Sequence, residues 1–448
     1  MQTVRHFFPS FNRWCDQVPD GRDQEAIIYD RRFLIWWGVL LYLLQFGSRR
    51  QLDFELDQRG TKVLNNLNRL AETKQDTRPV HDTLDYFLEH SQPAAFAKLR
   101  THMVQRLVRM KVLDAERIEG HLPIVLDGSG HLSFSHKHCD QCLVRKHEKH
   151  TQYLHQILEA KLLGPAGVTL SCASAFIENA DSATGKRPVP QTEQRKQDCE
   201  LKALDRLVPE LQEVFPQARL VLLGDALFAC GRVFQIAKDN HWRFLFTFKE
   251  GRLPAVWKEF QTLLQQSPQQ VVTLTTPDGI IQEYRWMNDL SYTDDQGRTW
   301  TFHALQLVET TADGTTTTFA WITDLPVDRD TVVTIAQGGR KRWRIENQGF
   351  NRQKNSGLNL EHVYSIDPNK LKAYYYLLQI AHIFLQLFEC SSLLRASAAQ
   401  YGRQVLQLFG SLKNMARRLL ECFRYQQLSD DVFDSKRASR LRVRLDSS

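Results

Sequence analysis

The run Leu122-Pro-Ile-Val-Leu-Asp127-Gly-Ser-Gly130 gives the first indication of the fold. A short apolar run that ends in an acid and small residues is typical of a buried strand with a carboxylate at its carboxyl end. The run Arg219-Leu-Val-Leu-Leu-Gly-Asp225 repeats this pattern, and an amphipathic helix is predicted between the two over residues 196–214. Strand, helix and strand in this order indicate an α/β sheet with a crossover connection.

The two acids at the strand ends form the first candidate site. Parallel neighbouring strands would bring Asp127 and Asp225 to the same edge of the sheet. Two carboxylates at close range are stable only if one is protonated or a cation lies between them. An acid after an apolar strand can also cap a loop or a helix, so either residue alone has a structural interpretation. The pair together predicts a metal site.

A third acid stands in a basic segment, Gly339-Arg-Lys-Arg342-Trp-Arg344-Ile-Glu346. Helical spacing places Glu346 on the same helix face as Arg342, one turn before it, and as Gly349 and Phe350, one turn after it. One interpretation is an ion pair between Arg342 and Glu346 on a solvated face, contributing only roughly 0.2–0.5 kcal/mol. The other is that Glu346 completes the metal site while neighbouring cations hold DNA phosphates. The predicted phosphate-binding residues are Lys341, Arg342, Arg344, Arg352 and Lys354.

These acids resemble those of the DDE transposases of bacterial insertion sequences, in particular a group whose third acid lies in a Tyr-x2-Arg-x3-Glu-x6-Lys signature. Arg342 and Glu346 match that spacing, whereas Gly339 stands at the tyrosine position and Gln353 at the lysine position. A closer resemblance is to a less-classified group of the same enzymes. It rests on five motifs between residues 120 and 385: Cys139-x2-Cys142, Tyr153-x-His155, Gln197-Asp-Cys-Glu200, Gly224-Asp-Ala-Leu-Phe228 and Arg342-Trp-Arg-Ile-Glu-Asn-Gln-Gly-Phe-Asn351.

The resemblance implies a fold and a chemistry. The fold is a ribonuclease-H-like catalytic domain in which Asp127, Asp225 and Glu346 hold two Mg²⁺ (or Mn²⁺) ions. One ion would activate a water or a 3′-hydroxyl, and the other would stabilise the leaving oxygen of an in-line displacement at phosphorus. The implied activity is cleavage at transposon ends and transfer of the 3′ ends into target DNA. The implied partners are double-stranded DNA, both transposon ends and target, and a second copy of the chain when DNA is bound.

Two alternatives remain open: a catalytically silent DNA-binding regulator derived from a transposase, and a stand-alone ribonuclease-H-like nuclease. Residues 270–322 bear on the choice, because their alternation predicts antiparallel strands with turns at Asp278-Gly279, Gln296-Gly297 and Asp313-Gly314. A β-rich insertion ahead of Glu346 and a basic tail favour transposition, since a transposase must also hold its own ends and a partner subunit. Three tryptophans of the insertion would either pack in the core or stack on an unpaired base: Trp286, Trp300 and Trp321.

Helical periodicity dominates the two ends of the chain. Apolar spacing over residues 23–115, punctuated by arginine and lysine, predicts a helical N-terminal region that is either DNA-binding or purely structural. The expected division is residues 1–115 for this region, 116–251 for the first part of the ribonuclease-H-like core, 252–322 for the β-rich insertion, 323–390 for the second part of the core, and 391–448 for a basic helical region.

Composition fits a soluble nucleic-acid-binding protein. The 58 lysines and arginines exceed the 51 aspartates and glutamates, which gives a net charge of +7. A basic balance fits a DNA partner but is not unique to one. The longest apolar stretch, residues 33–44, is too short to span a bilayer, and the N-terminal residues lack the pattern of an export signal. We therefore expect no membrane partner and a cytoplasmic, bacterial nucleoid-associated location.

The densest cluster of cysteines and histidines lies between residues 136 and 155. Cys139-x2-Cys142 is the usual half of a tetrahedral zinc site, because a tight turn aims two thiolates at one point. Spacing does not identify the other half. The resemblance points to His155 and Cys199, which gives a structural Zn²⁺ held by Cys139, Cys142, His155 and Cys199. The alternative is a polar hairpin whose thiols stay free and reduced.

Overall fold

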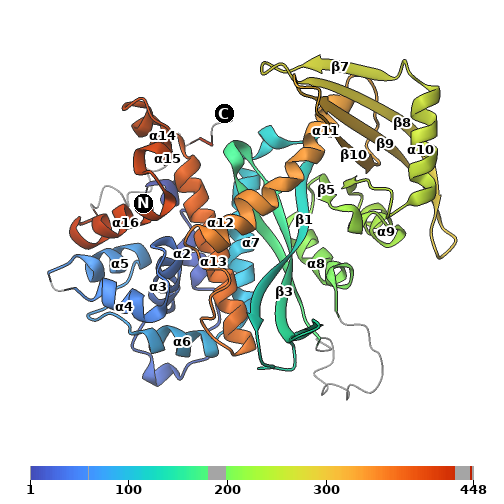
Figure 1. The fold of residues 1–448 in the computed structure, drawn as a ribbon. Coiled ribbons are helices and arrows are strands. Elements are labelled where there is room, and N and C mark those ends of the chain that lie inside the picture. The colour runs from blue at the N-terminus through green and yellow to red at the C-terminus, as the bar shows by residue number, and fades with distance from the viewer. Residues whose placement is uncertain (1, 59, 180–197, 429–443, 446–448) are drawn as a thin grey trace.

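The computed structural model describes residues 2–58, 60–179, 198–428 and 444–445. Within them a ten-stranded mixed sheet runs in the order β2-β3-β1-β5-β6-β10-β9-β8-β7, and β4 also pairs with β3. A long helix, α13 (Pro368–Cys390), lies between this sheet and the N-terminal helices (Figure 1). The arrangement confirms the α/β class that the sequence predicts.

The centre of the sheet is parallel. β1 (Leu122–Phe134), β5 (Leu220–Gly224) and β6 (Arg243–Thr247) run in the same direction. The helix α8 (Glu200–Val214) leads into β5, and α9 (Gly231–Asp239) joins β5 to β6. The apolar runs of β1 and β5 are buried, because a parallel sheet is covered by its crossover helices.

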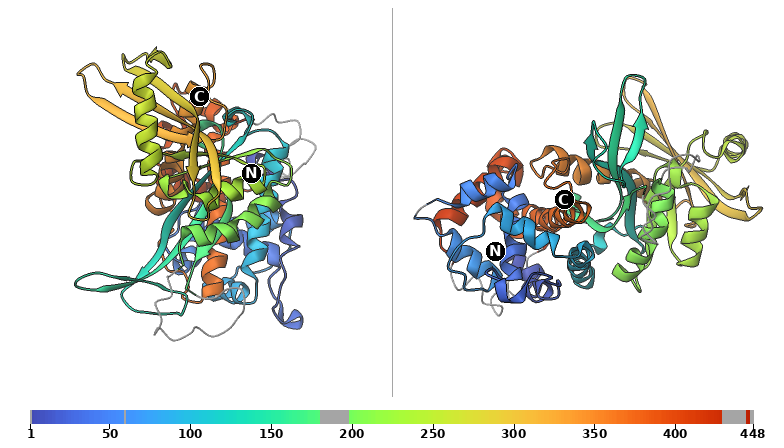
Figure 2. Two further views of the ribbon diagram at one scale, coloured as in Figure 1. Left: turned by 90° about the vertical axis from the view of Figure 1, so that its right-hand side faces the viewer. Right: turned by 90° about the horizontal axis from the view of Figure 1, so that it is seen from below.

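Antiparallel strands extend the sheet on the other side of β1. β3 (Thr151–Leu163) pairs with β1, with β2 (Leu143–Lys146) and with β4 (Thr169–Ile177). Figure 2 (left) shows the far end of this part of the sheet, in teal and green, running out beyond the helices as a narrow arm. The strand that carries Asp127 therefore continues into a projecting hairpin.

The β-rich segment before Glu346 forms the other edge of the same sheet. Its antiparallel strands fall where the alternation predicts them, and the glycines of the three predicted turns have positive φ, which glycine adopts at no steric cost. Because β10 pairs with β6, however, this segment continues the core sheet rather than forming a sheet of its own. The elements are α10 (Pro254–Gln266), β7 (Val271–Thr275), β8 (Ile281–Thr293), β9 (Thr299–Thr310) and β10 (Thr316–Thr323).

The N-terminal helices pack around α13 rather than forming a detached unit, and α3, α6 and α7 contact it directly. One of their cations is internal: Arg100 is fully buried, donates to the hydroxyl of Ser171 at 2.8 Å and pairs with Glu210. Arg100 is therefore unavailable to DNA. The helices are α1 (Gln2–Phe7), α2 (Phe11–Cys15), α3 (Arg31–Leu43), α4 (Arg49–Leu56), α5 (Val63–Ala71), α6 (His81–Glu89) and α7 (Pro93–Arg109).

The segment that carries Glu346 changes helix type along its length. The helix α11 (Val332–Arg340) passes into a 3-10 turn at Lys341–Trp343 and a π-helical turn at Ile345–Phe350, and α12 (Asn351–Asn355) follows. π-Helical turns are rare and are frequent at functional sites.

The C-terminal helices α14 (Ser392–Ala399), α15 (Val405–Phe409) and α16 (Leu412–Tyr425) return to the N-terminal region, where α16 contacts α5. Part of the basic tail, residues 429–443, lies outside the described residues. In the part of the chain that the structure describes, no helix has the length and apolar character needed to cross a membrane.

Candidate active site

The parallel pairing of β1 with β5 brings Asp127 and Asp225 to one level of the sheet. The register joins Val125 to Leu223, and each acid lies two residues beyond that pair. Asp127 is on the edge of the core, with a side chain 18% exposed. Asp225 accepts a 2.8 Å hydrogen bond from the N–H of Leu227, which fixes its carboxylate at the start of the next turn. The sheet therefore holds both acids rigidly at one edge.

Arg342 links Glu346 to Asp127, because its guanidinium lies close to both carboxylates. The Nη1 atom of Arg342 lies 3.9 Å from Oδ2 of Asp127 and 3.8 Å from Oε1 of Glu346. The guanidinium also lies 4.3 Å from the centre of the Trp343 ring. Arg342 is therefore a buried bridge between two acids from different elements, and not only the partner of Glu346 on a solvated face.

The π-helical turn places side chains of different exposure close together. The Glu346 side chain is 44% exposed. Gly349, in contrast, is buried against the side chain of Lys161, to which a Cβ at that position would come within 3.1 Å. Phe350 is buried as well. That Gly349 and Phe350 share the face of Glu346 stays a prediction.

A fourth carboxylate, Glu200, joins the acids from the N-terminus of α8. Gly128, directly after Asp127, makes room for it, because a side chain at that position would collide with the Glu200 carboxylate. Burial raises the pKa of Glu200, and Asp225 adds to the rise. In the sequence Glu200 is only the end of the motif Gln197-Asp-Cys-Glu200, whose Gln197 lies outside the described residues. An acid at a helix start carries no signal that it faces a sheet edge.

The crowding of carboxylates has an electrostatic consequence for Asp127. Burial raises the pKa of this acid to about 7; Arg342 opposes the rise, and Glu346, Glu200 and Asp225 add to it. An aspartate that titrates near neutrality marks a place where negative charge is incompletely compensated. A divalent cation relieves that condition.

The donor atoms suit a hard cation such as Mg²⁺ or Mn²⁺, which prefers carboxylate oxygens. Among the described residues, however, no three carboxylates have ligand oxygens that all lie within 4.8 Å of one another. Arg342 lies between Asp127 and Glu346. The chemistry of the donor atoms fits a divalent ion, whereas the described carboxylates are not gathered within ligand distance of one point.

The basic side chains around Glu346 have partners within the chain. Arg344 is the most internal, since it donates to the carbonyl oxygens of Gly164 at 2.5 Å and Val168 at 2.8 Å, and burial lowers its pKa. Binding of DNA phosphates by these residues stays a prediction, and for Arg344 the contacts favour a structural role. The other ion pairs are Lys341–Glu116 at 2.7 Å, Arg352–Glu389 at 2.6 Å and Lys354–Glu361 at 2.8 Å.

A second group of ligand-type side chains lies further along the β1–β3 hairpin. One ligand atom from each of His138, Cys139, Cys142 and His155 lies within 4.8 Å of the others. The structure thus brings His138, and not Cys199, to the three expected residues. Cys199 is exposed at the N-cap of α8, where its neighbour Glu200 turns toward the acids instead.

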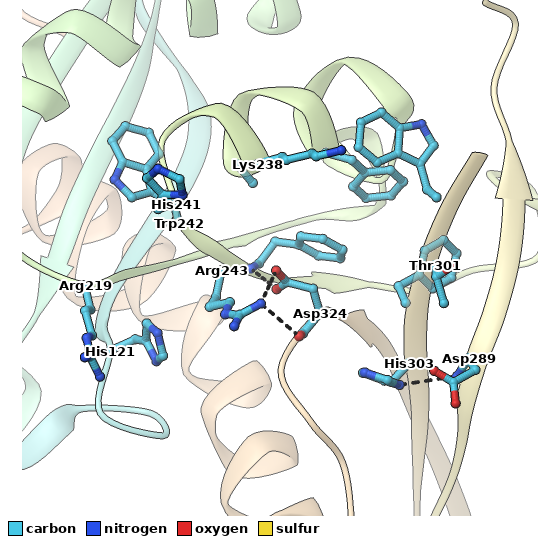
Figure 3. A pocket seen from close by; sticks show the side chains of 15 residues that line it. His121, Arg219, Lys238, His241, Trp242, Arg243, Asp289, Thr301, His303 and Asp324 are labelled. Atoms are coloured by element: carbon cyan, nitrogen blue, oxygen red, sulfur yellow. Dashed lines mark hydrogen bonds and ion pairs between the residues drawn. The ribbon is translucent and has the colours of Figure 1, made fainter. Parts of the chain in front are cut away.

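An open hollow of about 810 Å³ lies at the other end of the parallel strands (Figure 3). Arg219, Lys238 and Arg243 line it, and Arg243 pairs with Asp324 at 3.2 Å. Because Arg219 precedes β5 whereas Asp225 follows it, the hollow is not part of the carboxylate site. Of the three tryptophans, Trp300 lines this hollow, and the other two, Trp286 and Trp321, are buried in the core.

No family model and no curated protein matches the sequence. Among solved structures, the chain is similar to the cryo-EM structure of the piggyBac transposase synaptic complex with hairpin DNA, at 10% identity and a TM-score of 0.37. The match covers 97% of this chain and 82% of that chain.

Proposed function

We propose that the chain is a DDE transposase, which cleaves DNA at the ends of a mobile element and joins the freed 3′ ends to target DNA in metal-dependent reactions. The observation that carries the proposal is the register that sets Asp127 beside Asp225, with Glu346 reaching them through Arg342. The sequence resemblance to DDE transposases, which points to the same three acids, also supports it.

The order of the strands supports a ribonuclease-H-like core. Antiparallel strands β1, β3 and β4 come first in the chain, parallel strands β5 and β6 follow, and the acids lie on β1 and directly after β5. Strands β7 to β10 then intervene before Glu346, at the place where the resemblance implies a β-rich insertion.

Two Mg²⁺ or Mn²⁺ ions at this site would activate the attacking water or 3′-hydroxyl and stabilise the leaving oxygen. Asp127 and Asp225 hold their carboxylates on the rigid sheet, and Glu346 completes the ligand set from a half-exposed turn. Glu200 adds negative charge, which favours cation binding. Arg342, freed from bridging the acids, is positioned to neutralise a phosphate oxygen of the DNA.

A strand-transfer assay tests the proposal. Labelled duplexes that carry the DNA flanking the gene are incubated with the protein, Mg²⁺ and a target plasmid. We expect cleavage at an element end, followed by joining of the labelled 3′ end to the plasmid. If the protein cleaves the DNA without joining it, the chain is a stand-alone nuclease and not a transposase. If the protein binds the DNA without cleaving it, the chain is the catalytically silent regulator.

A matched pair of substitutions ties the activity to the site. Asp225→Asn removes one carboxylate charge at the sheet edge, whereas Asp278→Asn removes one from an exposed turn between β7 and β8. We expect Asp225→Asn to eliminate both cleavage and joining while DNA binding persists, and Asp278→Asn to leave both reactions unchanged. Titration of Mn²⁺ by electron paramagnetic resonance, without DNA, checks that the first variant has lost metal.

A further inference from the structure

We propose that His138, Cys139, Cys142 and His155 form a structural zinc site at the base of the projecting β2–β3 arm. The first three residues come from the turn between β1 and β2, and His155 comes from β3. The proposed transposase chemistry uses none of them. The zinc site and the carboxylate site therefore stand or fall separately.

The distances between the donor atoms fit one tetrahedral ion. The two Sγ atoms are 3.5 Å apart, and Nε2 of His155 lies 3.4 Å from Sγ of Cys139 and 3.6 Å from Sγ of Cys142. Nδ1 of His138 lies 3.4 Å from Sγ of Cys142. With Zn–S of about 2.3 Å and Zn–N of about 2.05 Å, a tetrahedron has edges of about 3.8 Å between sulfurs and about 3.6 Å between sulfur and nitrogen. Each measured edge is within about 0.3 Å of these values.

A disulfide and simple packing explain the cluster less well. A separation of 3.5 Å between the sulfurs is far from the roughly 2.05 Å of a disulfide bond. Thiols are weak hydrogen-bond donors, and Cys142 and His155 are each only 2% exposed. Without an ion, buried polar groups would have to rely on weak contacts alone.

The kind and number of donors indicate zinc in a structural role. Two sulfurs and two imidazole nitrogens suit Zn²⁺ and do not suit Mg²⁺, which prefers oxygen. Four protein ligands fill a tetrahedron and leave no position for water or substrate, whereas a catalytic zinc site keeps one position open.

The site lies where three paired strands, β1, β2 and β3, come together. His155 on β3 is the register partner of Leu132 on β1, and Cys142 directly precedes β2. The carbonyl oxygen of Cys142 also accepts a 2.9 Å hydrogen bond from the side chain of Asn179, just after β4. Zinc at this point would fix the place where the arm leaves the sheet. Figure 2 (left) shows the arm itself running out beyond the helices.

The zinc content of the full chain, purified without a chelator or a metal-affinity tag, tests the proposal. We expect about one zinc per chain, and less than about a tenth of a zinc per chain would overturn the proposal. His138→Asn and Cys142→Ser should each lose the bound zinc, and Cys199→Ser, the matched cysteine control at α8, should retain it. If the His138→Asn variant kept its zinc and the Cys199→Ser variant lost it, this ligand set would be wrong.

Cobalt substitution in the unmutated chain keeps the test valid if Cys142→Ser does not fold. Tetrahedral Co²⁺ with thiolate ligands gives strong visible bands and a sulfur-to-metal charge-transfer band, and we expect both. A weak spectrum typical of octahedral Co²⁺ would contradict the proposal. A spectrum that does not change when the thiols are alkylated would contradict it as well. Strand transfer measured on the same samples separates the two sites: a chain that lacks zinc but still joins DNA leaves the proposed function intact.

Discussion

The carboxylate site and the Cys/His group share one hairpin but differ in how completely the fold assembles them. The four Cys/His ligand atoms all lie within 4.8 Å of one another, whereas Asp127 and Glu346 meet only across the guanidinium of Arg342. In the proposed zinc site, four protein ligands would close the tetrahedron and leave no position for substrate. At the proposed active site, carboxylates held apart at a sheet edge would leave room for substrate, and their mutual repulsion would make that part of the fold less stable.

The largest expected effect is a pair of opposite outcomes at the two sites. Asp127→Asn should lower strand cleavage by about 10³-fold or more, because losing a metal ligand removes several kcal/mol of transition-state stabilisation. The same substitution should raise the melting temperature at pH 8, since it removes a carboxylate that burial and three other acids destabilise. Cys142→Ser should instead lower the melting temperature and leave cleavage by the folded fraction measurable.

Cleavage rates and melting curves on the same preparations check both halves of this contrast. A stable, active Cys142→Ser variant would show that the Cys/His group contributes nothing to the fold. An Asp127→Asn variant that melts earlier than the parent chain at pH 8 would show that the acids are structural caps.

The pH dependence of stability sharpens the same contrast. The pKa of Asp127 is about 7 in the folded chain and 3.8 as the unperturbed value, so the folded state binds more protons between these limits. Stability should therefore fall as pH rises from about 4 to 7, by up to about 1.4 kcal/mol for each unit of pH. Mg²⁺ competes with that proton and should raise the melting temperature more at pH 8 than at pH 5.5. Asp127→Asn should flatten both trends in differential scanning fluorimetry.

A smaller effect is expected at Glu200, which contributes charge to the site from α8. Glu200→Gln keeps the shape that Gly128 accommodates and removes one negative charge, so cleavage at limiting Mg²⁺ should fall by about tenfold and recover at high Mg²⁺. Glu178→Gln, at the end of β4, provides a buried-acid control. A loss of cleavage that high Mg²⁺ does not rescue would assign Glu200 a direct role in the reaction.

The parts of the fold set by local signals could be predicted from the sequence. The strands of β7 to β10 alternate and end at glycine turns, and the apolar runs before Asp127 and Asp225 are buried strands, as expected. The continuation of the core sheet through β10 could not be predicted, because strand pairing depends on which edge is free and not on local pattern. The π-helical turn at Glu346 has no local signal either.

The site was predictable to the extent that sheet register determines it. Asp127 and Asp225 follow apolar strands, so the parallel pairing was enough to bring them together. His138 could not be distinguished from its neighbouring histidines by spacing, because the turn before β2 is irregular and only its three-dimensional path aims Nδ1 at Cys142. Arg344 reads as a DNA-binding residue in the sequence, whereas its contacts with Gly164 and Val168 are visible only in the fold.

The smallest effects concern the basic side chains, which differ between the neighbourhood of Glu346 and the projecting β2–β3 arm. Arg145 and Lys149 are exposed at the far end of the arm, whereas Arg344 is bonded to two carbonyl oxygens inside the protein. If the arm follows DNA phosphates, Arg145→Ala and Lys149→Ala should each reduce the slope of log affinity against log salt by about one unit. Arg344→Ala should leave that slope unchanged and lower the melting temperature, since it removes two hydrogen bonds to buried carbonyl oxygens, of which only that of Val168 keeps a backbone donor, the N–H of Gly164. Salt titrations of DNA binding, with melting curves of the same variants, measure both quantities. A flatter slope for Arg344→Ala together with unchanged stability would return this arginine to the DNA-binding surface, and unchanged slopes for both arm variants would remove the arm from it.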